Sequence, residues 1–290
     1  TDAGGFDGYR VERRFGDLNR SGWEEMKQDG ISFNSPNRFG MRAAVLTSAE
    51  QNRVRGGGWD LATLQRVVDQ FVLHYDASGT SAQCFKRLHD DRGLSIHFLL
   101  DVDGTLYQTL DLKERAWHAT GANSRSIGIE IANIGAYPSA TAEPLRTWYK
   151  KDAEGHPRLH IPKGAELGAL DLKKVSGRPV RPELVKGKIN GSEFFQYDLT
   201  AEQYAALTKL TAALCAIFPN LPCDTPRTPD GNLRTDTLSP DELKAFSGVL
   251  GHYHIQTNKI DPGPAMQWER VIEGARELLN RQKKAETKAP

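Results

Sequence analysis

Cysteine is scarce in this sequence, and so are long apolar runs. Three cysteines among 290 residues are an odd number and too few for a disulfide framework. Cys215 and Cys223 flank a Phe-Pro-Asn turn and are close enough in sequence to pair in an exported protein; the alternative is three unpaired thiols. No stretch is long and apolar enough to cross a membrane, so the sequence predicts no membrane span.

A strong charge of one sign is also lacking. The 38 basic and 37 acidic residues leave a net charge of +1, which provides no global basic field for nucleic acid. The apolar fraction of 38% is ordinary and differs from that of a disordered chain. The sequence starts at Thr1 and has no signal-like apolar segment, so we expect a processed mature form or a shortened chain. We predict a periplasmic or secreted location in preference to a cytoplasmic one.

Composition and hydrophobic pattern divide the chain into four parts. Residues 1–58 are rich in Gly, Arg and Asn and are expected to form an extended arm with one short helix near 22–27. Residues 59–282 are expected to form a catalytic domain, interrupted at about 136–197 by a mostly irregular insertion. Residues 283–290 are expected to be a flexible tail.

Within the domain, apolar runs predict strands and amphipathic periods predict helices. Strands are expected at 71–75, 95–101, 105–110 and 126–133, and an Asp-Gly turn joins the second to the third. Helices are expected at 60–70, 81–91, 200–218, 239–246 and 268–282. This mixture predicts an α/β protein with a mixed central β-sheet flanked by helices.

The most informative stretch is GHYHIQTNKIDPGPAMQW, residues 251–268. It contains His252, His254 and Asp261, which are residue types that bind zinc, and a Pro-Gly-Pro turn that stiffens the backbone after the carboxylate. A catalytic zinc usually takes three protein ligands and keeps one position for water. Because this stretch offers two or three candidates, a distant ligand is also considered: His74, which follows a buried apolar run.

Five motifs in order resemble a known family. They are FVLHYDAS (71–78), SIHFLLDVDGTLYQ (95–108), KERAWHATGANS (113–124), SIGIEIAN (126–133) and the stretch 251–268. Together they resemble the zinc-dependent N-acetylmuramoyl-L-alanine amidases of the Amidase_2 type, which are related to peptidoglycan recognition proteins, and within them the AmpD-like branch. The resemblance spans roughly residues 71–279 around the insertion. It implies hydrolysis of the amide between N-acetylmuramic acid, or its 1,6-anhydro form, and L-alanine of the peptidoglycan stem peptide.

The resemblance also implies roles for five residues. His74, His252 and Asp261 would bind one Zn²⁺ per chain, Glu130 would be the general base for the attacking water, and Lys259 would stabilise the oxyanion. His254 stands where AmpD-like proteins commonly have Asp. If it lay on a strand with His252 it would face the opposite way, so we interpret it as a supporting residue; the alternative is a surface histidine.

Substrate contacts follow from the same motifs. His118 in AWHAT is expected to face the substrate groove, and Trp117 and Asn133 are weaker groove candidates, since a packing role for Trp117 is equally consistent. Ile96 stands where phage amidases and catalytic recognition proteins carry a tyrosine, which shifts the catalytic role onto Glu130. The partner is expected to be peptidoglycan or a muropeptide. The insertion is left open as a lid, a dimerisation element or a substrate contact, and the oligomeric state is left open too.

Two other functions compete with this interpretation. A non-catalytic peptidoglycan-binding module would be expected to have lost a zinc ligand, whereas this chain keeps all three. LLDVDGTL at 99–106 matches the motif of haloacid-dehalogenase phosphatases. That motif should lead into a helix or cap, but Tyr107–Leu110 continues as a strand, so a hairpin with an Asp-Gly turn explains the segment.

Overall fold

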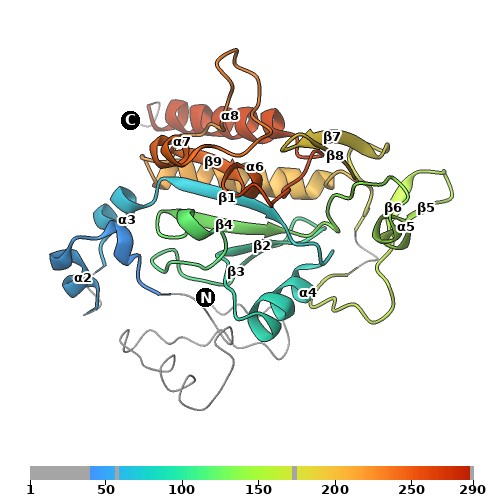
Figure 1. Ribbon diagram of the computed structural model, residues 1–290, viewed down its shortest axis with the longest axis horizontal. Helices are drawn as coiled ribbons and strands as arrows, with labels where there is room; N and C mark the ends of the chain where they lie inside the picture. Colours follow the sequence, from blue (N-terminus) through green and yellow to red (C-terminus); the bar gives the residue numbers. More distant parts are fainter. Residues whose placement is uncertain (1–39, 56–58, 172–174, 288–290) are drawn as a thin grey trace.

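The core of the protein is a five-stranded mixed sheet (Figure 1). The computed structural model describes residues 40–55, 59–171 and 175–287. The sheet has the order β3-β2-β4-β1-β9; β1, β2, β4 and β9 run parallel, and β3 is antiparallel to β2. Its strands are β1 (Gln70–Tyr75), β2 (Phe98–Leu100), β3 (Leu106–Gln108), β4 (Ser126–Ile131) and β9 (Gly248–Gly251). The predicted fold class is therefore confirmed.

Apolar residues on both faces place β1 and β4 at the centre of the sheet. Phe71 and Leu73 of β1 and the isoleucines of β4 are fully buried on one face, as is typical of parallel strands covered on both sides. Because side chains alternate along a strand, His74 and Glu130 point to the opposite face. The two are paired in the register between β1 and β4, so they project side by side.

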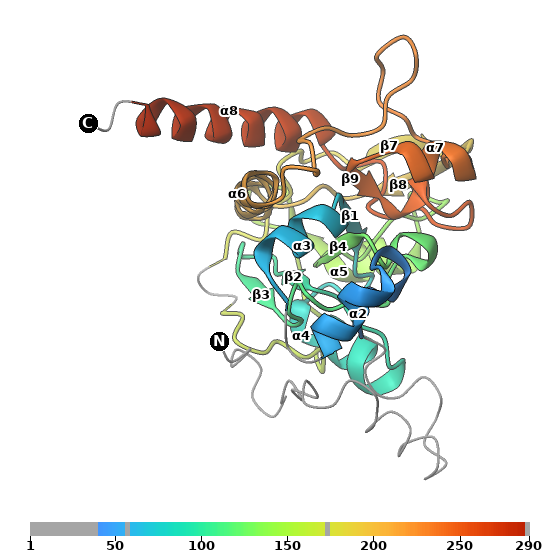
Figure 2. The same ribbon diagram turned by 90° about the vertical axis from the view of Figure 1, so that its left-hand side faces the viewer.

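Helices cover the two faces unequally. The long helices α6 (Ala201–Ile217) and α8 (Trp268–Glu286) lie side by side over the apolar face, and α8 extends beyond the body (Figures 1 and 2). A capping box between Thr200 and Gln203 starts α6. The face of His74 is covered by α4 (Ser81–Lys86), which continues as a π-helix at Arg87–Asp91. Two further short helices are α3 (Leu61–Val67) and α7 (Pro240–Ala245).

Some expectations for the two ends of the chain are wrong. Residues 43–45 form a 3₁₀ helix and Ser48–Arg55 forms α2, although an extended arm was expected over residues 1–58. The cause is a capping box: Thr47 Oγ1 accepts from the Glu50 amide, and the Glu50 carboxylate accepts from the Thr47 amide. At the other end, α8 continues to Glu286 through the first part of the predicted tail. The short helix expected near 22–27 lies outside the described residues.

The insertion is more regular than expected. It contains α5 (Glu143–Trp148), a hairpin of β5 (Tyr149–Lys151) and β6 (Pro157–Leu159), and a second hairpin of β7 (Val185–Ile189) and β8 (Ser192–Gln196). Asn190 and Gly191 join β7 to β8 with positive φ angles of 50° and 77°, which a tight two-residue hairpin turn requires. The Asn-Gly pair is a strong hairpin signal, so the expectation of a mostly irregular segment is corrected.

Two further observations concern the cysteines and the membrane. Cys84, Cys215 and Cys223 are all free thiols, so the structure contains no bridge between the last two. Among the described residues, none of the helices combines the length and the apolar character that crossing a bilayer requires.

Candidate active site

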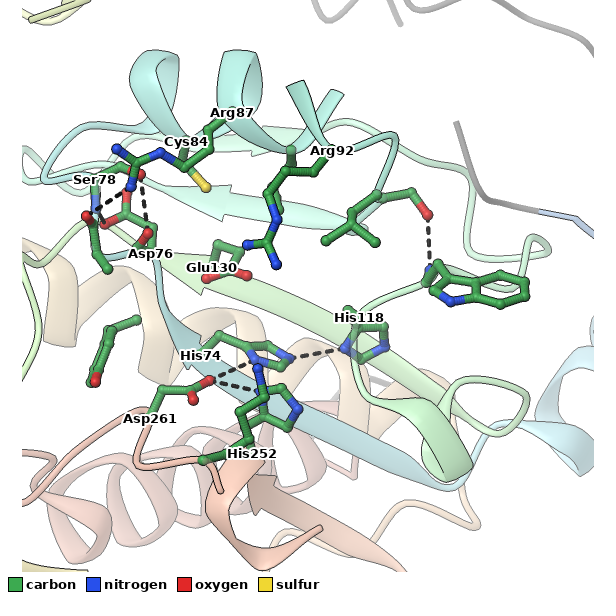
Figure 3. A pocket seen from close by; sticks show the side chains of 17 residues that line it. His74, Asp76, Ser78, Cys84, Arg87, Arg92, His118, Glu130, His252 and Asp261 are labelled. Carbon is green, nitrogen blue, oxygen red and sulfur yellow. Dashed lines mark hydrogen bonds and ion pairs between the residues drawn. The ribbon is translucent and has the colours of Figure 1, made fainter. Parts of the chain in front are cut away.

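Three side chains from two distant parts of the sequence converge at the carboxyl ends of β1 and β9 (Figure 3). His74 Nδ1 lies 2.8 Å and His252 Nδ1 lies 3.0 Å from the same oxygen, Oδ2 of Asp261. All three residues are buried, with exposed fractions of 2%, 5% and 8%. Their three candidate ligand atoms lie within 4.8 Å of one another, so the structure brings the predicted metal ligands together.

The local fold explains how these residues meet. His74 is near the end of β1, and His252 follows the adjacent parallel strand β9 in a 3₁₀ turn at His252–His254. The Tyr253 amide donates to the carbonyl of Asp261, which ties the turn to the loop of the third ligand. A Cβ at Gly251 would lie 2.7 Å from Cδ of Pro262, so this close approach of strand and loop requires glycine.

The chemistry of the three donors fits a zinc ion. Burial and, to a smaller extent, the nearby His252 together lower the pKa of His74 to about 4, so this imidazole is neutral at neutral pH. Burial alone would raise the pKa of Asp261, but hydrogen bonds and charge interactions with the two histidines hold it below its usual value. Neutral imidazole and ionised carboxylate are the protonation states that a metal binds, and zinc accepts both ligand types.

Glu130 faces these ligands from the neighbouring strand. It is paired with His74 in the strand register, and Figure 3 shows its carboxyl group pointing into the same pocket. Its Oε2 atom is buried and has no hydrogen-bond partner among the described residues. Burial raises the pKa of Glu130 well above its usual value, the Asp261 carboxylate adds to this, and Lys259 opposes it. A carboxyl group with a raised pKa in a pocket is suited to proton transfer.

The pocket in front of these residues has a volume of about 210 Å³. Lys259 lines it from the loop between His252 and Asp261, and Arg87 and Arg92 line it from the α4 side. Trp117 also lines the pocket, is 37% exposed, and has the Arg115 guanidinium 4.2 Å from its ring centre.

His118 lines the pocket but also contacts a candidate ligand directly. Its Nδ1 lies 2.9 Å from Nε2 of His74, and its Nε2 lies 3.1 Å from the Ser126 hydroxyl. Burial lowers its pKa well below the usual value, and His74 adds to this. A hydrogen bond to the second nitrogen of a ligating histidine fixes its tautomer and ring orientation. The structure therefore places the predicted substrate contact next to His74, a candidate metal ligand.

Asn133 and His254 occupy buried positions beside the site. Asn133 is 3% exposed and is not among the described residues that line the pocket; its Nδ2 donates to the Tyr197 carbonyl. His254 is 1% exposed, accepts from the Gly251 amide and contacts the Arg234 carbonyl, which excludes a surface role. His254 does not lie on a strand, because the chain leaves the sheet at Gly251, so the argument from strand alternation does not apply to it.

Arg42 is a supporting residue of the site that no sequence motif predicts. Its side chain is fully buried and donates to the carbonyls of Leu112 at 2.9 Å and Ser126 at 3.0 Å. Its Nη2 also lies 3.2 Å from Nε2 of His97, which is fully buried. Burial lowers the pKa of Arg42 to about 9. Arg42 thus joins the two ends of segment 112–126, which carries His118. A single arginine in the N-terminal arm forms no motif that would predict this role.

Comparison with known proteins supports the resemblance for part of the chain. Residues 64–169 match the family model described as N-acetylmuramoyl-L-alanine amidase, Amidase_2, so the resemblance is confirmed there. The match includes His74, His118 and Glu130 and ends before His252 and Asp261. No curated protein matches the chain.

Several solved structures are similar to this one at low sequence identity. The amidase AmiD from E. coli, in complex with the substrate anhydro-N-acetylmuramic acid-L-Ala-D-gamma-Glu-L-Lys, is 19% identical over 71% of this chain, with a TM-score of 0.39. This chain spans little more than half of that protein, 57%. The amidase LysC from Clostridium intestinale is 15% identical over 75% of this chain and 88% of its own, with a TM-score of 0.38. A selenomethionine derivative of AmpD is 16% identical over 84% of this chain and 96% of its own, also with a TM-score of 0.38.

Proposed function

We propose that this protein is a zinc-dependent N-acetylmuramoyl-L-alanine amidase of the AmpD-like branch. It would hydrolyse the amide between the lactyl group of N-acetylmuramic acid and L-alanine of a peptidoglycan stem peptide. The observation that carries this proposal is the buried group of His74, His252 and Asp261 facing the Glu130 carboxyl across one pocket. The family match over residues 64–169 supports the reaction class.

His74, His252 and Asp261 would hold the metal. When bound, zinc supplies a Lewis acid that polarises the amide carbonyl and makes a water molecule more acidic. His118 orients the His74 imidazole through the 2.9 Å contact to its Nε2, so that Nδ1 is directed at the pocket.

Glu130 moves the proton in this mechanism. Its carboxylate takes a proton from the attacking water and passes it to the leaving nitrogen of L-alanine. The raised pKa suits both steps, because the group holds the proton well enough to deliver it to the amine. The Lys259 ammonium is placed to stabilise the negative charge that develops on the carbonyl oxygen.

The pocket lining supports a peptide that carries carboxylates. Lys259, Arg87 and Arg92 contribute basic groups to a lining that also contains acidic residues, and Trp117 offers a flat apolar surface at its wall. The AmiD complex contains an anhydro-muropeptide, and we extend that class of substrate to this chain together with intact peptidoglycan. We also propose a periplasmic or secreted location, which fractionation of the native host would test.

One experiment tests the function. Purified protein is assayed for zinc by elemental analysis and for release of peptides with a free N-terminal L-alanine from muropeptides by mass spectrometry. We expect about one zinc per chain and hydrolysis, with both lost in His252→Ala and both kept in the exposed control His156→Ala. If the protein contains zinc but hydrolyses neither muropeptide nor intact wall, it is a binding module and not an amidase. If the protein is free of zinc and shows no activity after zinc is added, the proposal is overturned.

A further inference from the structure

The loop that carries Lys259 and Asp261 has little structure of its own. Between residues 255 and 267, all of which the structure describes, there is no helix or strand. Inside the loop, the Lys259 amide donates to the Gln256 carbonyl, and the Asp261 carbonyl accepts from Tyr253. A ligand must be held close to its productive geometry, so other contacts have to fix this segment.

The tip of the β7–β8 hairpin supplies the first of these contacts. Asn190 Nδ2 donates to the carbonyls of Thr257 and Lys259, both at 3.2 Å. Its Oδ1 accepts from the Thr237 amide at 2.8 Å, and Thr237 Oγ1 donates in turn to the Tyr253 carbonyl. One amide side chain therefore joins the loop of Lys259 to the segment that packs beside the His252 turn.

The base of the hairpin supplies the second contact, on the other side of Asp261. Gln196 is 1% exposed; its Nε2 donates to the Pro262 carbonyl at 3.0 Å and its Oε1 accepts from the Ala265 amide at 2.9 Å. A Cβ at Gly263 would lie 2.2 Å from that Oε1, so only glycine allows the loop to come this close.

The backbone of the hairpin also packs on the loop directly. A Cβ at Gly187 would lie 2.8 Å from Cβ of Pro264. Both ribbon views place β7 and β8 near the N-terminal end of α8, which follows this loop (Figures 1 and 2). The hairpin thus contacts the loop before and after Asp261, at residues 257, 259, 262, 264 and 265.

We infer that the β7–β8 hairpin is a clamp that sets the position of Asp261 and Lys259, with Asn190 and Gln196 as its positioning residues. This inference rests on the proposed zinc site. The hairpin lies outside residues 64–169, which match the family model. The insertion would therefore be a structural part of the site in this chain and not a peripheral addition. Loss of the clamp lets the ligand loop shift, which weakens metal binding and moves Lys259 away from the carbonyl oxygen.

The test compares three variants in the same hairpin. Gln196→Met keeps the size of the side chain but removes its hydrogen bonds. Asn190→Gly accommodates the positive φ at the turn but removes the amide that bonds the carbonyls of Thr257 and Lys259. Glu193→Gln is the matched control on β8, because Glu193 is exposed and pairs only across the hairpin with Lys186. Zinc affinity is measured by competition with a chromophoric chelator, well below the melting temperature of each apoprotein.

We expect Gln196→Met to bind zinc at least about 10-fold more weakly, Asn190→Gly a few-fold more weakly, and Glu193→Gln like the wild type. The visible spectrum of the Co²⁺-substituted protein should change in Gln196→Met, which a general loss of stability would not cause. Unchanged affinity and spectrum in both variants would overturn the clamp even if activity falls. If Gln196→Met does not fold, the tip variant decides alone. A wild type that binds no metal would instead remove the proposed function, and the clamp with it.

Discussion

His74 and Glu130 stand on two hydrogen-bonded strands, whereas Lys259 and Asp261 stand on a loop without regular structure. On the first side, the backbone ladder between β1 and β4 fixes both residues, and His118 holds the ring of His74. On the second side, the amide side chains of Asn190 and Gln196 in the inserted hairpin hold the loop in position.

This difference shows how one site can combine two kinds of support. A strand pair is specified by local apolar patterns and tolerates few changes, because a shift of one residue turns every side chain to the other face. A clamped loop depends on a few hydrogen bonds between segments far apart in sequence, so it is easily lost or adjusted. We therefore expect changes on the sheet side to affect the chemical step most, and changes in the clamp to act through metal binding and the placement of Lys259.

The largest effect is expected on the sheet side at Glu130. Glu130→Gln keeps the size of the side chain but cannot accept a proton, so kcat should fall by about 10²–10⁴-fold. Zinc content should remain at the wild-type level, because Glu130 is not a ligand in the proposed site. The measurement is steady-state hydrolysis of a muropeptide together with elemental analysis, and wild-type turnover in this variant would assign the base to another residue.

A smaller effect is expected from the loop side at Lys259. Lys259→Met removes the charge while keeping the aliphatic chain, and kcat should fall by about 10²–10³-fold if the ammonium stabilises the oxyanion. KM should change little, since the contact is made mainly in the transition state. A rise in KM with constant kcat would show that Lys259 serves only to bind substrate, and Lys188→Met on the nearby hairpin provides a lysine control.

The next effect compares the support of the two sides directly. His118→Phe keeps an aromatic ring but removes the hydrogen bond to His74 Nε2, so zinc should bind about 10–100-fold more weakly. A loss similar to that in Gln196→Met would mean that the ring support and the hairpin clamp contribute equally. If zinc binds His118→Phe as tightly as the wild type, the strand alone orients His74 and His118 is free to serve the substrate.

Local signals in the sequence predicted the sheet side well. Apolar runs predicted the strands of His74 and Glu130, and amphipathic periods predicted the helices α6 and α7. The motif order also selected the three residues that meet in the structure. These features lie within short windows of sequence, where periodicity and capping are informative.

The loop side could be predicted only in part. The Asn-Gly pair at 190–191 and the capping box at Thr47 and Glu50 were readable but were overlooked. In contrast, the contacts of Gln196 to the loop and of Arg42 to the segment before β4 join residues more than 60 positions apart. Nothing in the neighbourhood of either residue signals such a partner, because the contact exists only once the fold has formed.

The last expected effect concerns stability rather than catalysis, and it arises behind the sheet side at Glu114. This carboxyl group is 5% exposed, and its Oε2 is buried without a hydrogen-bond partner among the described residues. Burial and, to a smaller extent, the nearby Asp111 carboxylate together raise its pKa to about 7. Because the folded pKa is above the unfolded value, the stabilising contribution is fully present below about pH 4.5 and is lost as the pH rises through 7.

Glu114→Gln stays neutral throughout this range, so its free energy of unfolding should exceed that of the wild type progressively from pH 4.5 to 7 and then level off. The gain should be at most about 3 kcal/mol above pH 7, measured by urea unfolding across the pH range. Other buried carboxyl groups are the same in both proteins and cancel in the difference.

Zinc affinity should be unchanged, because the Glu114 side chain is not among the residues that line the site. Parallel pH profiles would show that Glu114 is ionised in the folded protein at neutral pH. If Glu114→Gln also bound zinc more weakly, stability and metal binding would be coupled on the sheet side. The contrast between the strand support of His74 and the hairpin support of Asp261 would then be lost.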